Sequence, residues 1–315
     1  MAVIFEKVAL IGLGLIASSM AHAMRQRGLA TTITGYARSA ETRAVAMELG
    51  FCDAVFDSAA EAVAGADLVV LAVPVGAMET VAKEIGPFLK PGATITDVGS
   101  VKQAVIEAVA PHIPPRAHFI PSHPLAGTEH SGPRSGFATL FENRWWLLTP
   151  LPGTNPAAVA RLRGFYEAMG AYVDEMDAAH HDLVLAVTSH TPHLIAYTMV
   201  GVADDLRRVT DSEVIKYSAA GFRDFTRIAA SDPTMWRDVF LNNKDATLEI
   251  LGRFTEELFA LQRAIRKGDG AHLHEYFTRT RAIRRSIIQA GQDTAAADFG
   301  RGATPAAPVD IPKKP

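Results

Sequence analysis

The chain has 315 residues, a length that corresponds to about two domains of ordinary size. Lysine and arginine number 31 against 34 aspartates and glutamates, a formal net charge of −3, so the basic excess typical of proteins that bind nucleic acid is missing. The single cysteine, Cys52, excludes an internal disulfide and a cysteine-based zinc cluster and is typical of a reducing compartment. Because no signal pattern and no apolar run of about 18 residues is present, we expect a cytoplasmic protein without a membrane segment.

The first half of the chain alternates short aliphatic runs with helical patterns. Buried strands are predicted at residues 8–11, 32–36, 68–73, 94–98 and 118–120. Two further strands, at 145–149 and 172–175, flank a predicted helix over 156–169. Such alternation is typical of βαβ units and of a parallel sheet.

The second half of the chain has the pattern of an all-helical domain. From His180 onward no strand pattern is found, and residues 236–267 and 271–290 repeat apolar side chains at helical spacing. We therefore predict a first domain over 1–176, an all-α domain over 177–294 and a disordered tail over 295–315. The join has no flexible glycine/serine linker, so we expect a fixed cleft between the two domains.

A glycine-rich loop follows the first predicted strand. Gly12, Gly14 and Ala17 precede a helical pattern in the spacing of dinucleotide-binding proteins. Gly12 permits the tight turn, and Gly14 lets the backbone approach a pyrophosphate at the helix N-terminus, beside Leu15 and Ile16. The alternative is a strand, turn and helix without a ligand. We favour dinucleotide binding by a doubly wound parallel sheet of the Rossmann type.

The end of the second predicted strand bears on the choice between NAD and NADP. NAD enzymes place an acidic residue about 20 residues after the glycine-rich loop, where it binds the ribose 2′-hydroxyl. This chain has Ala37, Arg38 and Ser39 there, and a guanidinium with a hydroxyl suits a 2′-phosphate. We expect NADP, with NAD as the alternative if Arg38 is only a solvated loop residue. Val73 and Pro74, at the end of the third predicted strand, complete the expected cofactor contacts.

Polar residues follow the strands predicted at 94–98 and 118–120. Ser100 and His123 fall at carboxyl ends of strands, where ligands bind in open α/β sheets. A histidine there can accept a hydroxyl proton while a hydride leaves the same carbon. His123 is therefore a candidate catalytic base, and the alternative is a structural histidine before a proline.

Five segments in order carry a more specific signal. They are GLGLIASS at 12–19, DVGSVK at 97–102, SHPLAGTEHSG at 122–132, HHDLVLAVTSHTPHLIA at 180–196 and GFRDFTRIAASDPTMWRD at 221–238. Together they resemble the prephenate/arogenate dehydrogenase family of tyrosine biosynthesis, from about residue 8 to about residue 292. The resemblance implies a Rossmann domain and a helical domain that forms a homodimer. Because only a short tail remains beyond the matched region, we expect no fused chorismate mutase or ACT-type domain. The implied reaction is the oxidative decarboxylation of prephenate or arogenate, to 4-hydroxyphenylpyruvate or tyrosine, with hydride transfer to NADP or NAD.

The resemblance also implies roles for single residues. His123 matches the histidine that takes the proton of the ring hydroxyl, and Ser100 matches the serine that positions that hydroxyl and the nicotinamide. The implied substrate-binding set comprises a side-chain contact, a carboxylate-binding arginine and two neighbours, namely His193, Arg227, Thr128 and Trp236. A tryptophan at such a position is also typical of a core or an interface.

The remaining polar residues of the helical half leave alternatives open. Asp182 follows His180 and His181 and precedes His190 and His193, a grouping that could form a metal cluster. Hydride transfer needs no metal, so we expect none and predict a structural or orienting role for Asp182 and His181. Other readings are a β-hydroxyacid dehydrogenase or imine reductase, and a catalytically silent NADP-binding sensor. Tyrosine, which resembles the substrate in shape, is a candidate inhibitor.

Overall fold

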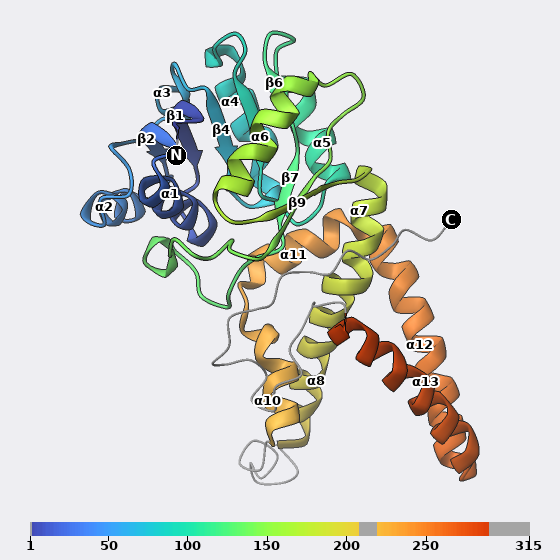
Figure 1. Cartoon of the computed structure of the whole chain (residues 1–315). Coiled ribbons are helices and arrows are strands. Elements are labelled where there is room, and N and C mark those ends of the chain that lie inside the picture. The colour runs from blue at the N-terminus through green and yellow to red at the C-terminus, as the bar shows by residue number, and fades with distance from the viewer. Residues whose placement is uncertain (1, 208–218, 290–315) are drawn as a thin grey trace. The chain divides into compact units, whose positions relative to one another are not determined.

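The computed structural model of the chain describes residues 2–207 and 219–289. The chain divides into two compact units, Met1–Ile250 and Leu251–Pro315. The first unit contains both sheets and the helices around them (Figure 1). The tail predicted at 295–315 lies outside the described residues. All candidate site residues fall in the first unit.

Six parallel strands form the main sheet in the order β3-β2-β1-β4-β5-β6. The strands are β1 (Phe5–Ile11), β2 (Ala30–Tyr36), β3 (Ala54–Phe56), β4 (Leu68–Leu71), β5 (Thr94–Asp97) and β6 (His118–Phe119). From β1 the chain winds outward to β3 and then returns beyond β1 to β4, which is the doubly wound order. The predicted parallel sheet is confirmed, and β3 is the strand that the sequence pattern missed.

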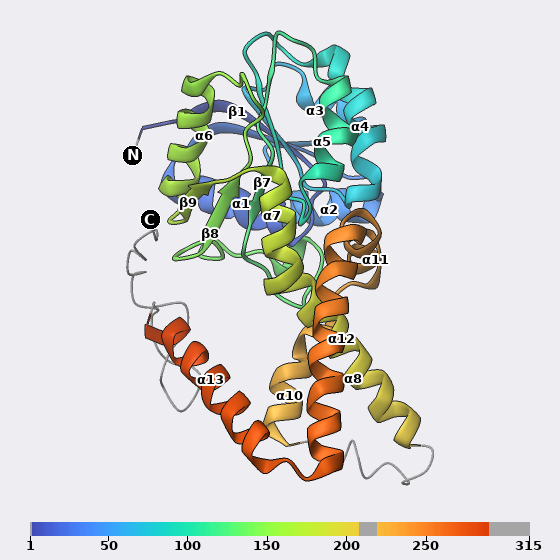
Figure 2. The ribbon, with the colours of Figure 1, turned by 90° about the vertical axis from the view of Figure 1, so that its right-hand side faces the viewer.

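Side chains alternate between the two faces of this sheet and bury both. Val8 and Leu10 pack in a cluster with α1 (Leu15–Arg27) and α6 (Pro156–Ala168). Ala9 and Ile11 point to the other face, which is covered by α3 (Ala59–Val63), α4 (Met78–Ile85) and α5 (Gln103–Val109). Figure 2 shows these helices on opposite sides of the sheet. Near-continuous apolar strands are what such a sandwiched sheet requires.

The last predicted strands belong to a second sheet. β8 (Trp145–Leu148) pairs antiparallel with β7 (Ser122–Pro124) and parallel with β9 (Tyr172–Glu175). Both predicted strands exist, but they form this separate sheet with β7, which carries His123 and was not predicted as a strand.

Local sequence explains where the helices of the first unit begin and end. Asn155 caps α6 at the amide of Ala157 with a proline next in the chain, and Gly28 ends α1 in the left-handed conformation. Asp177 caps α7 (Ala178–Leu185) by accepting hydrogen bonds from two backbone amides. A π-helical turn, η5 (Ala186–His190), joins α7 to α8 (Thr191–Arg207).

The remaining described helices continue the all-helical pattern. They are α10 (Ala220–Thr226), the 3-10 turn η6 (Arg227–Ala230), α11 (Pro233–Asn242), α12 (Lys244–Lys267) and α13 (Gly270–Gln289). The helix predicted over 236–267 is interrupted at Asn243, which ends α11. Beyond residue 177, the described part of the chain is helical and holds no strand.

One helical run, Ala178–Asp205, is long and apolar enough to cross a membrane by length and composition alone. It carries His181, Asp182 and His190 at buried positions with hydrogen-bond partners inside the protein. Its exposed face is apolar at Leu183, Val187, Met199, Val200 and Val202. The run is therefore only partly buried, and its apolar outer face suits contact with another protein surface.

Candidate active site

The loop between β1 and α1 leaves space above a helix N-terminus. Gly12 has a φ of 94°, and a Cβ there would lie 2.5 Å from the carbonyl oxygen of Ala72, so a larger residue does not fit. Gly14 precedes α1 without a side-chain cap, and a Cβ on it would meet no atom within 4 Å. Leu15 and Ile16 begin the helix and are partly exposed. This open space with uncapped amides fits the phosphates of a dinucleotide.

The end of β2 presents two guanidinium groups. Ala37 is buried, whereas Arg38 and Ser39 are exposed. The Ser39 hydroxyl accepts a hydrogen bond from the amide of Thr42 and so caps the next helix, α2 (Ala40–Glu48). Arg43 donates to the carbonyl oxygens of Ala37 at 2.7 Å and Arg38 at 3.0 Å. Sequence reasoning missed Arg43, although its position in the first turns of α2 places it beside the end of β2.

Val73, Pro74 and Ser100 follow neighbouring strands of the sheet. Val73 lies beside the glycine-rich loop, since its Cγ1 would be 3.0 Å from a Cβ on Gly12. Pro74 is exposed and precedes a short 3-10 turn. Ser100 is partly buried just after β5, with its backbone beside His190. These residues therefore lie at the carboxyl ends of β4 and β5, as predicted for a ligand crevice.

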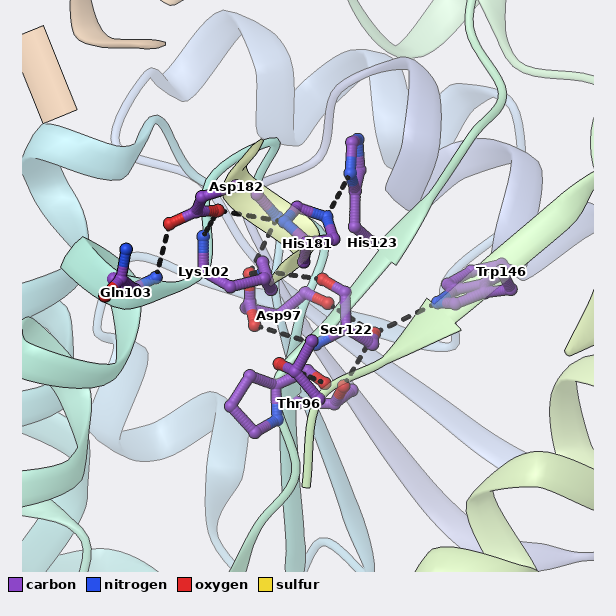
Figure 3. Close-up of polar contacts among 12 residues, drawn as sticks. Thr96, Asp97, Lys102, Gln103, Ser122, His123, Trp146, His181 and Asp182 are labelled. Carbon is purple, nitrogen blue, oxygen red and sulfur yellow. Dashed lines mark hydrogen bonds and ion pairs between the residues drawn. The ribbon is translucent and has the colours of Figure 1, made fainter. Parts of the chain in front are cut away.

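His123 begins a chain of hydrogen bonds that connects β7 with α7 and α5. Its Nδ1 lies 3.0 Å from Nε2 of His181, and Nδ1 of His181 lies 2.9 Å from a carboxylate oxygen of Asp182 (Figure 3). The Asp182 carboxylate also accepts hydrogen bonds from the backbone amides of Lys102 at 2.7 Å and Gln103 at 2.9 Å. His123, His181 and Asp182 are all buried. The orienting role expected for Asp182 and His181 thus has a direct geometric basis.

Burial and hydrogen bonding set the protonation states of His123, His181 and Asp182. Burial holds the pKa of His123 well below its usual value, with help from His181 and Lys102. It also lowers the pKa of His181 against the opposing hydrogen bond to Asp182. Burial alone would raise the pKa of Asp182, but the hydrogen bonds that the carboxylate accepts outweigh it and lower that pKa. At neutral pH the hydrogen-bonded side chains of His123, His181 and Asp182 are therefore two neutral imidazoles and one carboxylate.

A buried ion pair lies next to these hydrogen-bonded side chains. Lys102 is fully buried, and its ammonium group contacts the carboxylate of Asp97 and donates to the carbonyl oxygen of Ser122 at 2.7 Å. Asp97 also accepts from the amides of Gly99 at 2.8 Å and Ser122 at 3.1 Å. The pair connects the end of β5 to β7 and so fixes the residue before His123. Sequence reasoning gave neither residue a role, although both stand in the segment DVGSVK.

Two of the predicted substrate residues, His193 and Trp236, stack on each other, and a third, Arg227, lies near His193. The ring of His193 stacks on Trp236 with centroids 3.7 Å apart, and its Nδ1 donates to the carbonyl oxygen of Ser189 at 2.8 Å. Trp236 is buried in the core cluster on the α4 side of the sheet. Arg227 is exposed, lies close enough to lower the pKa of His193, and pairs with Glu129 at 3.1 Å. Glu129 follows His123 by six residues and had no predicted role.

Thr128 is placed differently from the other predicted substrate residues. Its side chain is exposed, and its hydroxyl accepts a hydrogen bond from the amide of His130 in its own loop. Within residues 2–207 and 219–289, no group of three or more His, Cys, Asp or Glu could hold a metal ion.

Comparison with known proteins gives the family of this fold and site. Residues 20–175 match a family model described as prephenate dehydrogenase, nucleotide-binding domain, and residues 177–279 match prephenate dehydrogenase, dimerization domain. A cyclohexadienyl dehydrogenase of Zymomonas mobilis is 42% identical over 90% of this chain and 97% of its own length. A prephenate dehydrogenase of Bacillus subtilis is 34% identical over 90% of this chain and 76% of its own length.

Solved structures agree with these sequence matches. Prephenate dehydrogenase from Aquifex aeolicus, in complex with hydroxyphenyl propionate and NAD⁺, superposes with a TM-score of 0.82 and 33% identity over 90% of this chain and 98% of that one. Arogenate dehydrogenase from Synechocystis superposes with a TM-score of 0.74 and 27% identity over 90% of this chain and 100% of that one. The chain therefore belongs to the prephenate dehydrogenase family, the dehydrogenases of tyrosine biosynthesis, as its motifs predicted.

Proposed function

We propose that the chain oxidatively decarboxylates prephenate, arogenate or both, with NADP as the preferred hydride acceptor and His123 as the proton acceptor. The observation that carries the proposal is the buried, neutral imidazole of His123 in β7, a strand that the Lys102–Asp97 pair connects to the end of β5. A neutral imidazole is suited to general-base catalysis.

The substrate is a cyclohexadienol with a carboxylate opposite the hydroxyl-bearing carbon. His123 accepts the hydroxyl proton as a hydride leaves that carbon. A nicotinamide dinucleotide, when bound, would supply the hydride acceptor. Loss of carbon dioxide then moves an electron pair to the new carbonyl oxygen, which recovers the proton from His123 and becomes a phenol. Ser100 positions the hydroxyl, and the reaction balances without a metal.

Arg227 and His193, which lies against Trp236, are the residues that bind the charged and side-chain ends of the substrate. Arg227 can bind the ring carboxylate through two charge-assisted hydrogen bonds, in which case the substrate replaces Glu129 as its partner. His193 retains an unprotonated Nε2, because its Nδ1 donates to a backbone carbonyl, and this nitrogen is free to meet the side-chain end of the substrate. Trp236 supports the ring of His193, and Thr128 contributes from the loop beyond His123.

The preference for NADP depends on the end of β2. Arg38 and Ser39 are exposed there, and Arg43 is held against the same backbone. Two guanidinium groups without a carboxylate at this position favour a ribose 2′-phosphate over a free 2′-hydroxyl. Replacing Arg38 with alanine should weaken NADP binding much more than NAD binding, and equal losses would remove this role.

We also propose that the chain works as a cytoplasmic homodimer built through its helical part. The match to a dimerization domain and the apolar outer face of Ala178–Asp205 support a dimer. The two family matches meet at residue 176, which supports a domain boundary there and domains over 1–176 and 177–294.

The test is an assay of reduced nicotinamide with prephenate or arogenate, each with NAD or NADP, with and without added tyrosine. Turnover in any combination identifies the substrate and cofactor, and slower turnover with tyrosine identifies an inhibitor. Silence in all four with intact dinucleotide binding would refute the substrate assignment. The His123→Asn variant should lose about 10²–10⁴-fold in kcat, whereas Arg227→Ala should mainly raise KM.

A further inference from the structure

The inference starts from the contact between the proposed base, His123, and a second imidazole, that of His181. Nδ1 of His123 and Nε2 of His181 are 3.0 Å apart, and their ring centroids are 5.2 Å apart at an interplanar angle of 64° (Figure 3). At least one of these nitrogens must carry a proton for the contact to be a hydrogen bond. Which one carries it decides whether Nε2 of His123 is free to accept a proton from the substrate.

The surroundings of Asp182 decide the question. Its carboxylate accepts hydrogen bonds from the amides of Lys102 and Gln103, and an ionised carboxylate can only accept. Nδ1 of His181, 2.9 Å from the same carboxylate, must therefore be the donor. Because a neutral imidazole has one protonated nitrogen, Nε2 of His181 is left as an acceptor. Nδ1 of His123 must then donate to it.

We infer that His181 and Asp182 are positioning residues that hold His123 in its Nδ1-protonated tautomer, so that its Nε2 is the proton acceptor. The inference rests on the proposed role of His123 in the reaction. The hydroxyl proton of the substrate bonds to Nε2, and Nδ1–H stays in its hydrogen bond to His181. The positive charge that forms on His123 is then stabilised through His181 by the Asp182 carboxylate, as in other imidazole–carboxylate arrangements.

The Asp182 carboxylate also fixes the position of His181 relative to His123. Asp182 and His181 belong to α7, whereas Lys102 and Gln103 begin α5 and His123 belongs to β7. The two backbone hydrogen bonds at the start of α5 hold α7 in place, and the hydrogen bond of His181 then sets the plane of the His123 ring.

The direct test is nitrogen NMR of the full chain labelled with ¹⁵N-histidine, at a pH above the pKa of both imidazoles. The His123→Asn variant assigns the His123 signals by their loss. We expect Nδ1 of His123 to show the shift of a protonated ring nitrogen and Nε2 that of an unprotonated one. An Nε2-protonated tautomer, or an equal mixture of the two, would overturn the inference. This readout needs no substrate, so it stands apart from any failure of the proposed function.

Two substitutions at position 181 separate positioning from mere packing. His181→Gln can keep an acceptor oxygen near the place of Nε2, whereas His181→Leu keeps bulk and removes the acceptor. We expect His181→Leu to lower kcat about 100-fold, within the range of general-base contributions, with the KM for the dinucleotide little changed. His181→Gln should recover most of this loss and keep the Nδ1-protonated signal of His123.

The neighbouring residue offers a matched control. His180 is exposed on the same helix, so His180→Leu should leave both kcat and the His123 signals as they are in the unmodified chain. Equal losses of kcat in His181→Gln and His181→Leu would show that the acceptor is not what matters. If His181→Leu does not fold, the tautomer of the unmodified chain and the signals of His181→Gln still decide the question.

Discussion

Replacing Gly14 with alanine separates dinucleotide binding from folding. The backbone at Gly14, with φ −88° and ψ −164°, is open to alanine, and its Cβ would meet no atom within 4 Å. Alanine is a poorer helix N-cap than glycine, but it also reduces the freedom of the unfolded chain. Because these effects oppose each other, we expect the free energy of unfolding to change by less than about 1 kcal/mol.

Dinucleotide binding should respond much more strongly. The added methyl group would fill the space through which a pyrophosphate reaches the first amides of α1. Loss of one hydrogen bond to a charged group costs about 1.5–3 kcal/mol, which corresponds to a rise in Kd of about 10- to 150-fold. Thermal denaturation and calorimetric titration with NADP measure the two quantities on the same sample.

Gly12→Ala is the matched control for the Gly14 variant. At Gly12 the φ of 94° and the carbonyl oxygen 2.5 Å from a Cβ predict strain, which costs about 1–3 kcal/mol or more of stability. The reasoning is refuted if Gly14→Ala binds NADP within about two-fold of the unmodified chain, or if it unfolds as readily as Gly12→Ala.

Three further predictions concern stability and assembly. Lys102→Met removes one partner of the buried pair with Asp97 and should destabilise the fold by about 3–5 kcal/mol in urea denaturation; a loss under about 1 kcal/mol would contradict the need for this pair. Burial lowers the pKa of His190 from 6.5 to about 4, so the unfolded chain binds more protons between these values, and stability should be full above pH 6.5 and fall toward pH 4. His190→Gln should flatten this dependence of Tm on pH, and an unchanged slope would count against it. Sedimentation should give twice the 33.8 kDa of one chain, with Val187→Lys shifting the protein toward monomer, whereas a purely monomeric unmodified chain would exclude the dimer.

Local sequence was sufficient for much of the fold. The strands of the main sheet are apolar runs between turn residues, and Gly28 and Asn155 mark helix ends through their own conformation or side chain. β7 was missed because it has three residues and ends at a proline, so neither length nor alternation reveals it. The break at Asn243 was missed because it depends on tertiary contacts: its side chain donates to His190 and to the carbonyl oxygen of Asp182.

The candidate site divides in the same way. The glycine-rich loop and His123 could be proposed from the sequence because each stands at a recognisable place, the end of a predicted strand. The contact of His123 with His181 joins residues 58 positions apart, and no spacing rule reveals it. Arg227 and Glu129 are 98 positions apart, and their pairing also depends on how the helical part folds back onto the loop after β7.

The π-helical turn at Ala186–His190 takes up one extra residue between the two ends of one helical run. Such a turn accommodates one residue more than the α-helical turn it replaces. Removing one residue there would restore regular α-helical winding, while the residues that follow keep their direction, so His193 would still stack on Trp236 and His181 would stay in place. A change of one residue in chain length at this turn would therefore be taken up locally, and both ends of the site would keep their geometry.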